Sequence, residues 1–118
     1  MQIGGQEPAE HKAMGILGAG TGLGVAGLLP YEGGYHVLDT EGGHADYSPI
    51  SDLQSAVVNC LRARFGRVSL ERLLSGKGLL NIYSALCSIE DTPMIFSTPA
   101  EITAAALDNT DTKALQTL

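Results

Sequence analysis

The sequence predicts an α+β fold (α/β in the broad sense of mixed strands and helices) in which a three-stranded antiparallel meander is followed by helices. Two observations carry this prediction. Between residues 14 and 38, three short apolar runs are separated by turns rich in glycine and proline, which is typical of adjacent antiparallel strands. After residue 51, apolar residues instead recur every three or four positions, which is the spacing of one helix face.

The predicted strands cover residues 14–17, 25–29 and 35–38. A glycine cluster over residues 18–24 separates the first two strands. A turn over residues 30–34 separates the second and third, because proline presets φ and the paired glycines admit positive φ.

Five helical segments follow the strands. Ser51 and Gln54 form a capping-box pattern that opens a first helix, which is expected to stop near Gly66. A short helix is predicted over residues 69–74 and is expected to end at Gly76. In this interpretation Ser75 is simply a residue at the C-terminus of that short helix.

The last three helices are predicted with different clarity. Apolar spacing over residues 79–87 indicates the third. The stretch of residues 98–101 (Thr-Pro-Ala-Glu) combines an N-cap, a proline at the first helical position and a glutamate three residues after the cap, so it opens a fourth helix that stops around Asn109. Thr110 and Asp111 cap a fifth, which is still in pattern at residue 118 and suggests a piece of a longer chain.

Composition excludes several classes of protein. The 118 residues match one domain, and 44% apolar against 17% charged residues excludes a disordered tail. A net charge of −6 with scattered basic residues argues against nucleic-acid binding. The uncharged stretch of residues 13–31 contains six glycines, so it predicts buried strand and turn and not a membrane span. Cys60 and Cys87 lie among apolar residues and are expected to be buried free thiols in a reducing cytoplasm.

The glycine cluster leaves two interpretations open. Gly18, Gly20, Gly22 and Gly24 alternate around Thr21 directly after a predicted strand. Such spacing lets backbone N–H groups approach an anion, with a hydroxyl available for a phosphate oxygen. The alternative is a tight, twisted hairpin without a ligand.

A dinucleotide-binding fingerprint is a weaker interpretation of the same cluster. Residues 22–27 match G-x-G-x-x-G, and Asp39 lies about where a ribose-binding acid is found. Pro30 and the glycine pair of residues 33–34 leave no room for the helix and second strand that this fold requires.

A second group of polar residues follows the third predicted strand. Glu41, His44 and Asp46 surround two glycines, at a place where loops commonly bind ligands. Three interpretations remain: a metal site that includes His36, although strand alternation points His36 away; a capped turn; and a polar small-molecule site. Sugar hydroxyls suit a carboxylate and an imidazole, because a hydrogen bond to an ionised group contributes about 1.5–3 kcal/mol. Glu71, next to Arg72, is expected on local grounds to lie on a solvated helix face.

Four segments, in order and at matching spacing, resemble the middle of a bacterial glucokinase, an ATP-dependent hexokinase of the actin-like (ribonuclease H-like) ATPase fold. They are LGAGTGLGVAGLLP over residues 17–30, TEGGHADYSP over 40–49, RVSLERLLSGKGLLNIY over 67–83 and PAEITAAAL over 99–107. The resemblance implies that residues 14–118 are part of the large domain, truncated at both ends, with residues 1–13 as a loose lead-in.

The resemblance also implies roles for six residues. Glu41, His44 and Glu71 bind glucose hydroxyls, which replaces the solvated face expected locally for Glu71. The second phosphate loop, for ATP, is formed by Gly20, Thr21 and Gly22. Lys77, where the family usually has proline, is expected to alter loop stiffness only.

The resemblance further implies that parts of the enzyme are missing from this chain. None of the enzyme's catalytic residues is expected in this chain, because the family's base, an aspartate, is expected upstream together with the first phosphate loop. The fragment itself is therefore expected to be inactive, while the full-length enzyme uses ATP and Mg²⁺, is cytoplasmic and forms a homodimer. Two alternatives remain: a non-catalytic sugar-binding or regulatory module, and a structural piece that self-associates.

Overall fold

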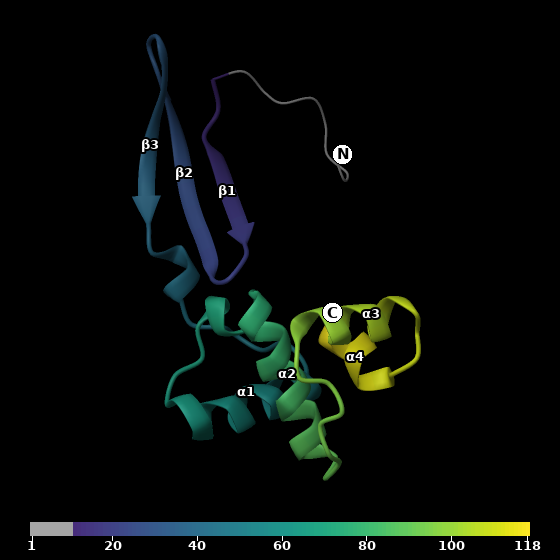
Figure 1. The fold of residues 1–118 in the computed structure, drawn as a ribbon. Coiled ribbons are helices and arrows are strands. Elements are labelled where there is room, and N and C mark those ends of the chain that lie inside the picture. Colours follow the sequence, from purple (N-terminus) through teal and green to yellow (C-terminus); the bar gives the residue numbers. More distant parts are fainter. Residues whose placement is uncertain (1–10) are drawn as a thin grey trace.

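The computed structural model describes residues 11–118, so most of the expected lead-in lies outside the described residues. Three antiparallel strands come first, and four α-helices and two short 3₁₀ turns follow them (Figure 1). The predicted order of a meander and then helices is confirmed. The elements are β1 (Met14–Ala19), β2 (Leu23–Tyr31), β3 (Gly34–Thr40), η1 (Gly42–His44), α1 (Asp52–Phe65), η2 (Leu70–Arg72), α2 (Gly76–Ile89), α3 (Pro99–Leu107) and α4 (Thr112–Thr117).

The strands are longer, and the turns between them shorter, than the sequence predicts. β2 lies in the middle of the sheet, and its register with β1 runs from the pair Met14–Leu28 to the pair Ala19–Leu23. The glycine cluster is therefore mostly strand, and only residues 20–22 form the turn between β1 and β2. Two residues, Glu32 and Gly33, connect β2 to β3.

The expectation that Pro30 belongs to the second turn is wrong. Pro30 lies inside β2 and is paired with Tyr35 of β3. The pairing with β1 extends along β2 only to Leu28, so at Pro30 the strand has a neighbour on one side. A proline without an N–H is tolerated at such a local edge. The positive φ of +105° is needed at Gly33.

The capping signals locate the start of α1, and a glycine locates its end. The hydroxyl of Ser51 accepts a hydrogen bond of 3.2 Å from the N–H of Gln54, as predicted. The side-chain oxygen of Gln54 in turn accepts from the N–H of Ile50, at 2.9 Å. At the other end Gly66 adopts a φ of +74°, a conformation that favours glycine, so the predicted stop is confirmed.

The short helix expected before α2 is replaced by a different arrangement. Only the single 3₁₀ turn η2 forms there, and Gly76 is the first residue of α2 and not the end of the preceding helix. Ser75 is the N-cap of α2, because its hydroxyl accepts a 3.0 Å hydrogen bond from the N–H of Gly78. The predictions for Gly76 and Ser75 are therefore wrong. Their signals suit either end of a helix, and here the serine caps the beginning of α2.

The helix predicted from residues 98–101 is confirmed in detail. The Thr98 hydroxyl accepts from the N–H of Glu101 at 3.3 Å, and the Glu101 carboxylate accepts from the N–H of Thr98 at 2.9 Å. The Glu101 carboxylate also accepts a hydrogen bond from the backbone N–H of Ser97. This bond is the largest cause, and the bonds from Thr98 are the next largest, of the lowered pKa of Glu101. α4 begins as predicted, with the Asp111 carboxylate accepting from the N–H of Ala114 at 2.7 Å.

Two adjoining clusters of apolar side chains form the helical core. One packs α1 and the residues on either side of η2 against α2, and the other packs the opposite side of α2 against α3 and α4. Cys87 is a buried free thiol of the second cluster, whereas Cys60 is only partly buried. The first cluster consists of Val57, Val58, Leu61, Val68, Leu73, Ala85 and Leu86, and the second of Tyr83, Cys87, Ile102, Ala105, Ala106 and Ala114.

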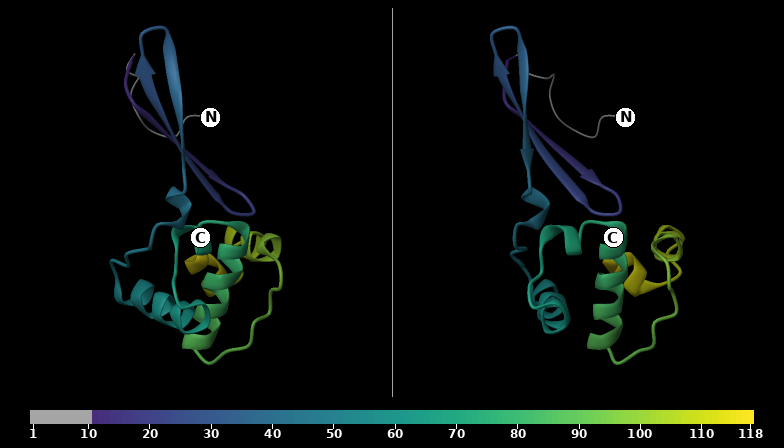
Figure 2. Two further views of the ribbon diagram at one scale, coloured as in Figure 1. Left: turned by 90° about the vertical axis from the view of Figure 1, so that its left-hand side faces the viewer. Right: turned by 60° about the vertical axis from the view of Figure 1, so that its left-hand side comes forward.

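The sheet stands at one end of the helical part, and the helices do not cover its faces (Figures 1 and 2). The radius of gyration is 17.3 Å, against about 13.5 Å for a compact domain of this length. The expectation that residues 13–31 are buried is wrong for β1, where Ile16 and Leu17 are 49% and 74% exposed. Among residues 11–118 no helix is long and apolar enough to cross a membrane.

Candidate functional site

A cleft of about 370 Å³ lies where the β1–β2 turn meets η1 and η2. The three elements come from distant parts of the sequence, and each contributes polar groups to the cleft. All six residues singled out above as site residues line it, together with four neighbours. The lining residues are Gly18, Gly20, Thr21, Gly22, Leu23, Gly24, Thr40, Glu41, His44 and Glu71.

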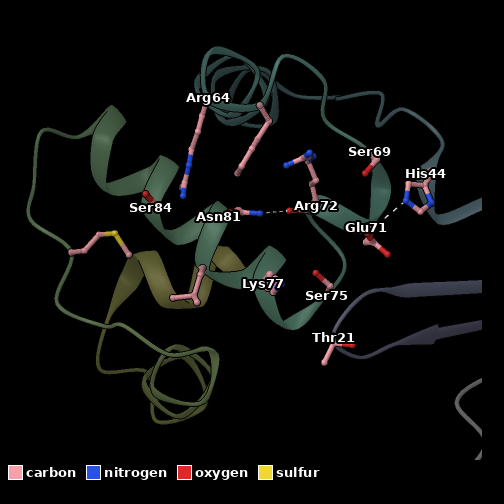
Figure 3. A pocket seen from close by; sticks show the side chains of 13 residues that line it. Thr21, His44, Arg64, Ser69, Glu71, Arg72, Ser75, Lys77, Asn81 and Ser84 are labelled. Carbon is pink, nitrogen blue, oxygen red and sulfur yellow. Dashed lines mark hydrogen bonds and ion pairs between the residues drawn. The ribbon is translucent and has the colours of Figure 1, made fainter.

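The imidazole of His44 lies between two carboxylates. Its Nδ1 is 3.0 Å from Oε2 of Glu41, and its Nε2 is 3.9 Å from Oε1 of Glu71 (Figure 3 shows the second contact). The Glu41 side chain is 88% exposed and the Glu71 side chain 36% exposed. The two carboxylates thus converge on one imidazole at the rim and the wall of the same cleft.

Glu71 does not lie on a solvated helix face, so the local expectation for this residue is wrong. η2 is one 3₁₀ turn and turns the side chain toward the sheet. Oε2 of Glu71 accepts a 3.1 Å hydrogen bond from the N–H of Leu23, at the start of β2. The carboxylate therefore joins the glycine turn to the imidazole of His44.

Backbone pairing brings η1 and η2 together. The N–H of Leu70 donates to the carbonyl of Ala45 at 2.9 Å, and the N–H of Tyr47 donates to the carbonyl of Val68 at 3.1 Å. The guanidinium of Arg67 contacts the carbonyl of His44 and the carboxylate of Asp46. These contacts hold the two short turns in one place although each has few residues of its own.

Close approach explains two glycines, Gly22 in the cleft and Gly43 of η1 beside it. A Cβ on Gly22 would lie 2.5 Å from Oε2 of Glu71, and a Cβ on Gly43 would lie 2.2 Å from the carbonyl oxygen of Leu23. The glycine turn also rests on the beginning of α2, because the N–H of Gly76 donates to the carbonyl of Gly20 at 2.8 Å. The tight hairpin is present, and it packs directly against the carboxylate.

Of the four residues considered for a metal site, Glu41 and His44 contact each other, and the other two have different neighbours. Asp46 contacts Arg67, and His36 lies in β3, paired with Leu29 and away from η1. Over residues 11–118 no three histidine, cysteine, aspartate or glutamate side chains come together as candidate ligands.

A larger cavity of about 650 Å³ adjoins the cleft. It shares Thr21, His44 and Glu71 with the cleft and continues along α2 toward α1 (Figure 3). Its other polar residues are Arg64, Ser69, Arg72, Ser75, Lys77, Asn81 and Ser84. These residues come from three elements and have no common spacing, so no local pattern in the sequence marks them.

Comparison of the sequence with known proteins finds glucokinases. A family model described as "Glucokinase" matches residues 1–118. A glucokinase of Hahella chejuensis is 44% identical over 117 residues, which are 99% of this chain and 36% of that protein. A glucokinase of Marinobacter nauticus is 50% identical over 103 residues, which are 87% of this chain and 32% of that protein.

Solved structures with a similar fold are also glucokinases. The crystal structure of a glucokinase from an Antarctic psychrotroph has a TM-score of 0.84 at 27% identity, over 96% of this chain and 35% of that one. The likeness confirms the expected actin-like ATPase fold. A glucokinase of Balamuthia mandrillaris in complex with glucose has a TM-score of 0.80 at 22% identity, over 92% of this chain and 33% of that one, and supports the fold.

The chain spans about a third of the length of the relatives that it matches. Within that third the family model covers every residue, from the glycine turn through the turns that carry Glu41 and Glu71 to the C-terminal helices. The 118 residues therefore belong to the glucokinase family.

Proposed function

We propose that the chain supplies the sugar-binding wall and the second phosphate loop of a glucokinase, which transfers the γ-phosphoryl group of ATP to the 6-hydroxyl of glucose. The observation that carries the proposal is the single cleft lined by Glu41, His44, Glu71 and the turn of residues 20–22. Acceptors for hydroxyl protons lie there beside backbone suited to an anion. Residues 14–118 then form part of the large domain.

Glu41, His44 and Glu71 bind and orient the hexose in this proposal. Carboxylate oxygens accept hydrogen bonds from sugar hydroxyls, and such charge-assisted bonds are about twice as strong as neutral ones. The contacts of His44 with both carboxylates fix the direction of its ring. A sugar held from several sides presents its 6-hydroxyl in one orientation, which is the main contribution of positioning to phosphoryl transfer.

The turn of residues 20–22 holds phosphate oxygens of ATP. Its glycines leave the backbone open to an anion, and the hydroxyl of Thr21 lines both the cleft and the adjoining cavity. Mg²⁺ in such reactions is carried largely by substrate phosphates and water. Among residues 11–118 no group of three acidic, histidine or cysteine side chains forms a candidate site for the ion.

The base that accepts the proton of the 6-hydroxyl is assigned to a part of the enzyme outside these residues. The chain's own role is therefore binding and orientation, and the isolated fragment is expected to be inactive. The cytoplasmic location and homodimer implied by the resemblance belong to the same proposal, which the family membership supports.

Replacing Glu41 by alanine tests the sugar site. In a full-length glucokinase chain that contains these 118 residues, we expect kcat/KM for glucose to fall about thirtyfold, which corresponds to about 2 kcal/mol of transition-state binding. The expected loss is smaller than for a buried carboxylate, because the Glu41 side chain is 88% exposed. Initial rates at varied glucose concentrations measure it.

Glu32→Ala is the matched control, since it removes an exposed acid from the distant β2–β3 turn. An unchanged kcat/KM for Glu41→Ala would refute the sugar role of Glu41. Glucose binding by calorimetry without any phosphorylation in the full-length wild-type protein would favour a sugar-binding module that is not a kinase.

Replacing Gly22 by alanine tests the link between the glycine turn and the sugar site. The new Cβ must displace the Glu71 carboxylate, which is the flexible end of a side chain, so unfolding free energy is expected to change by less than about 1 kcal/mol. Glucose affinity is expected to fall about tenfold, because Glu71 loses its hydrogen bond to Leu23.

Calorimetric titration with glucose and chemical unfolding of the same samples separate the two effects. Gly18→Ala is the control, because nothing lies within 4 Å of a Cβ at that position. Equal glucose affinities for Gly22→Ala and Gly18→Ala would contradict the proposed link.

A further inference from the structure

The larger cavity has two ends of different charge. One end carries Glu71 and His44, which it shares with the sugar cleft. Away from them the wall carries Arg64, Arg72 and Lys77, and among residues 11–118 Glu71 is the only carboxylate that lines the cavity. Figure 3 shows Arg64 reaching from α1 across the cavity toward Ser84 on α2. A neutral hexose bound at the end with Glu71 and His44 does not pair with the positive charges at the other end.

The concentration of positive charge is unusual for this chain. The sequence has seven lysines and arginines and a net charge of −6, yet three of the seven line this one cavity. In the part of the chain that the structure describes, the ion pairs of basic residues with carboxylates are those of Arg67 with Asp46 and of Lys113 with Glu90. The three cavity cations are thus available for an anionic ligand.

Packing holds the two arginines in place. The ring of Phe65 lies 4.8 Å from Cζ of Arg64 and 4.2 Å from Cζ of Arg72, so one aromatic side chain carries both guanidinium groups. The side-chain amide of Asn81 also donates to the carbonyl of Arg72 at 2.9 Å. Ordering the arginines in advance reduces the entropy lost when a ligand binds.

Lys77 lies on α2 next to a residue that contacts the glycine turn. It follows Gly76, whose N–H donates to the carbonyl of Gly20 at 2.8 Å. Thr21 and the hydroxyl of Ser75 line the same cavity, so a chain of anionic groups that starts at Thr21 has hydroxyls and cations along its path.

We propose that Arg64, Arg72 and Lys77 form a subsite for a linear oligophosphate, which extends from the glycine turn at Thr21 into the cavity. The inference rests on the proposed function for the sugar end of the site and adds a determinant for the phosphoryl donor. The shared chemistry is the phosphate chain, whether it is the tail of a nucleoside triphosphate or an inorganic oligophosphate.

The experiment compares two double variants of equal charge in a full-length chain that contains these residues. Arg64→Gln with Lys77→Gln removes two cavity cations, and Arg62→Gln with Lys12→Gln removes two exposed cations outside the cavity. Arg72 stays unchanged because it adjoins Glu71. Calorimetry measures the binding of tripolyphosphate and, separately, of ATP, and unfolding curves show that each variant is folded.

We expect the cavity variant to bind both tripolyphosphate and ATP about tenfold more weakly, with glucose affinity within twofold of wild type. The control variant is expected to stay within twofold for all three ligands. A loss for tripolyphosphate alone also supports the proposal and identifies an inorganic oligophosphate as the ligand. A single Lys77→Gln variant serves if the double variant does not fold.

Equal tripolyphosphate affinities for the cavity and control variants would overturn the proposal. A loss confined to ATP would overturn it as well, because the cluster would then recognise the nucleoside. Failure of the proposed function has a different signature: the full-length wild-type protein binds tripolyphosphate but forms no glucose 6-phosphate from ATP.

Discussion

Replacing Glu71 by alanine is expected to lower kcat/KM for glucose about a thousandfold in a full-length chain, the largest effect on activity among the residues of the cleft. Two losses combine. The sugar loses a carboxylate that is only 36% exposed, and the N–H of Leu23 loses its acceptor at 3.1 Å. Together they correspond to about 4 kcal/mol of transition-state binding. Initial rates at varied glucose and ATP concentrations measure the effect.

Glu71→Gln separates the two losses. The amide oxygen still accepts a hydrogen bond from Leu23, while the negative charge that strengthens bonds to sugar hydroxyls is gone. We expect an intermediate loss in kcat/KM, with the KM for ATP near the wild-type value. A Glu71→Ala enzyme with more than a tenth of wild-type kcat/KM would show that the carboxylate does not bind the sugar.

Replacing Gly43 by alanine is expected to destabilise the fold and the cleft together. The added Cβ would lie 2.2 Å from the carbonyl oxygen of Leu23, and backbone at the start of β2 cannot move aside as a flexible side chain can. η1 must shift instead, which is expected to lower the free energy of unfolding by about 2–4 kcal/mol. Glu41 and His44 flank the glycine on the two sides of this turn, so glucose affinity falls as well.

Denaturant unfolding and glucose titration of the same protein test this expectation. Gly15→Ala in β1 is the control, because no atom lies within 4 Å of a Cβ there. If Gly43→Ala unfolds at the same denaturant concentration as Gly15→Ala, the close contact between η1 and β2 does not support the site.

Local signals in the sequence were sufficient where one or two turns of backbone satisfy their own hydrogen bonds. The serine at position 51 and the threonine at position 98 mark helix starts that the structure confirms. Gly66 marks a helix end through its positive φ. Such interactions join residues three or four apart, so both partners lie within one short segment of the sequence.

Local signals failed where the same residue suits two structures. Ser75 and Gly76 fit the end of one helix as well as the start of the next, and the packing of Leu73, directly after η2, against α2 decided between them. Pro30 is typical of a turn, but β2 continues through it because the pairing with β1 stops at Leu28. In both cases the deciding neighbour is another element of the fold.

The candidate site divides in the same way. The residue pattern determined the antiparallel meander, the helix caps at Ser51, Thr98 and Asp111, and the polar group around Glu41 and His44, since each depends on short stretches of backbone. The tertiary structure alone decided that Glu71 faces the glycine turn and that Arg64, Arg72 and Lys77 share one cavity. The physical reason is that these side chains meet through backbone pairing between η1 and η2 and through helix packing, which join residues far apart in the sequence.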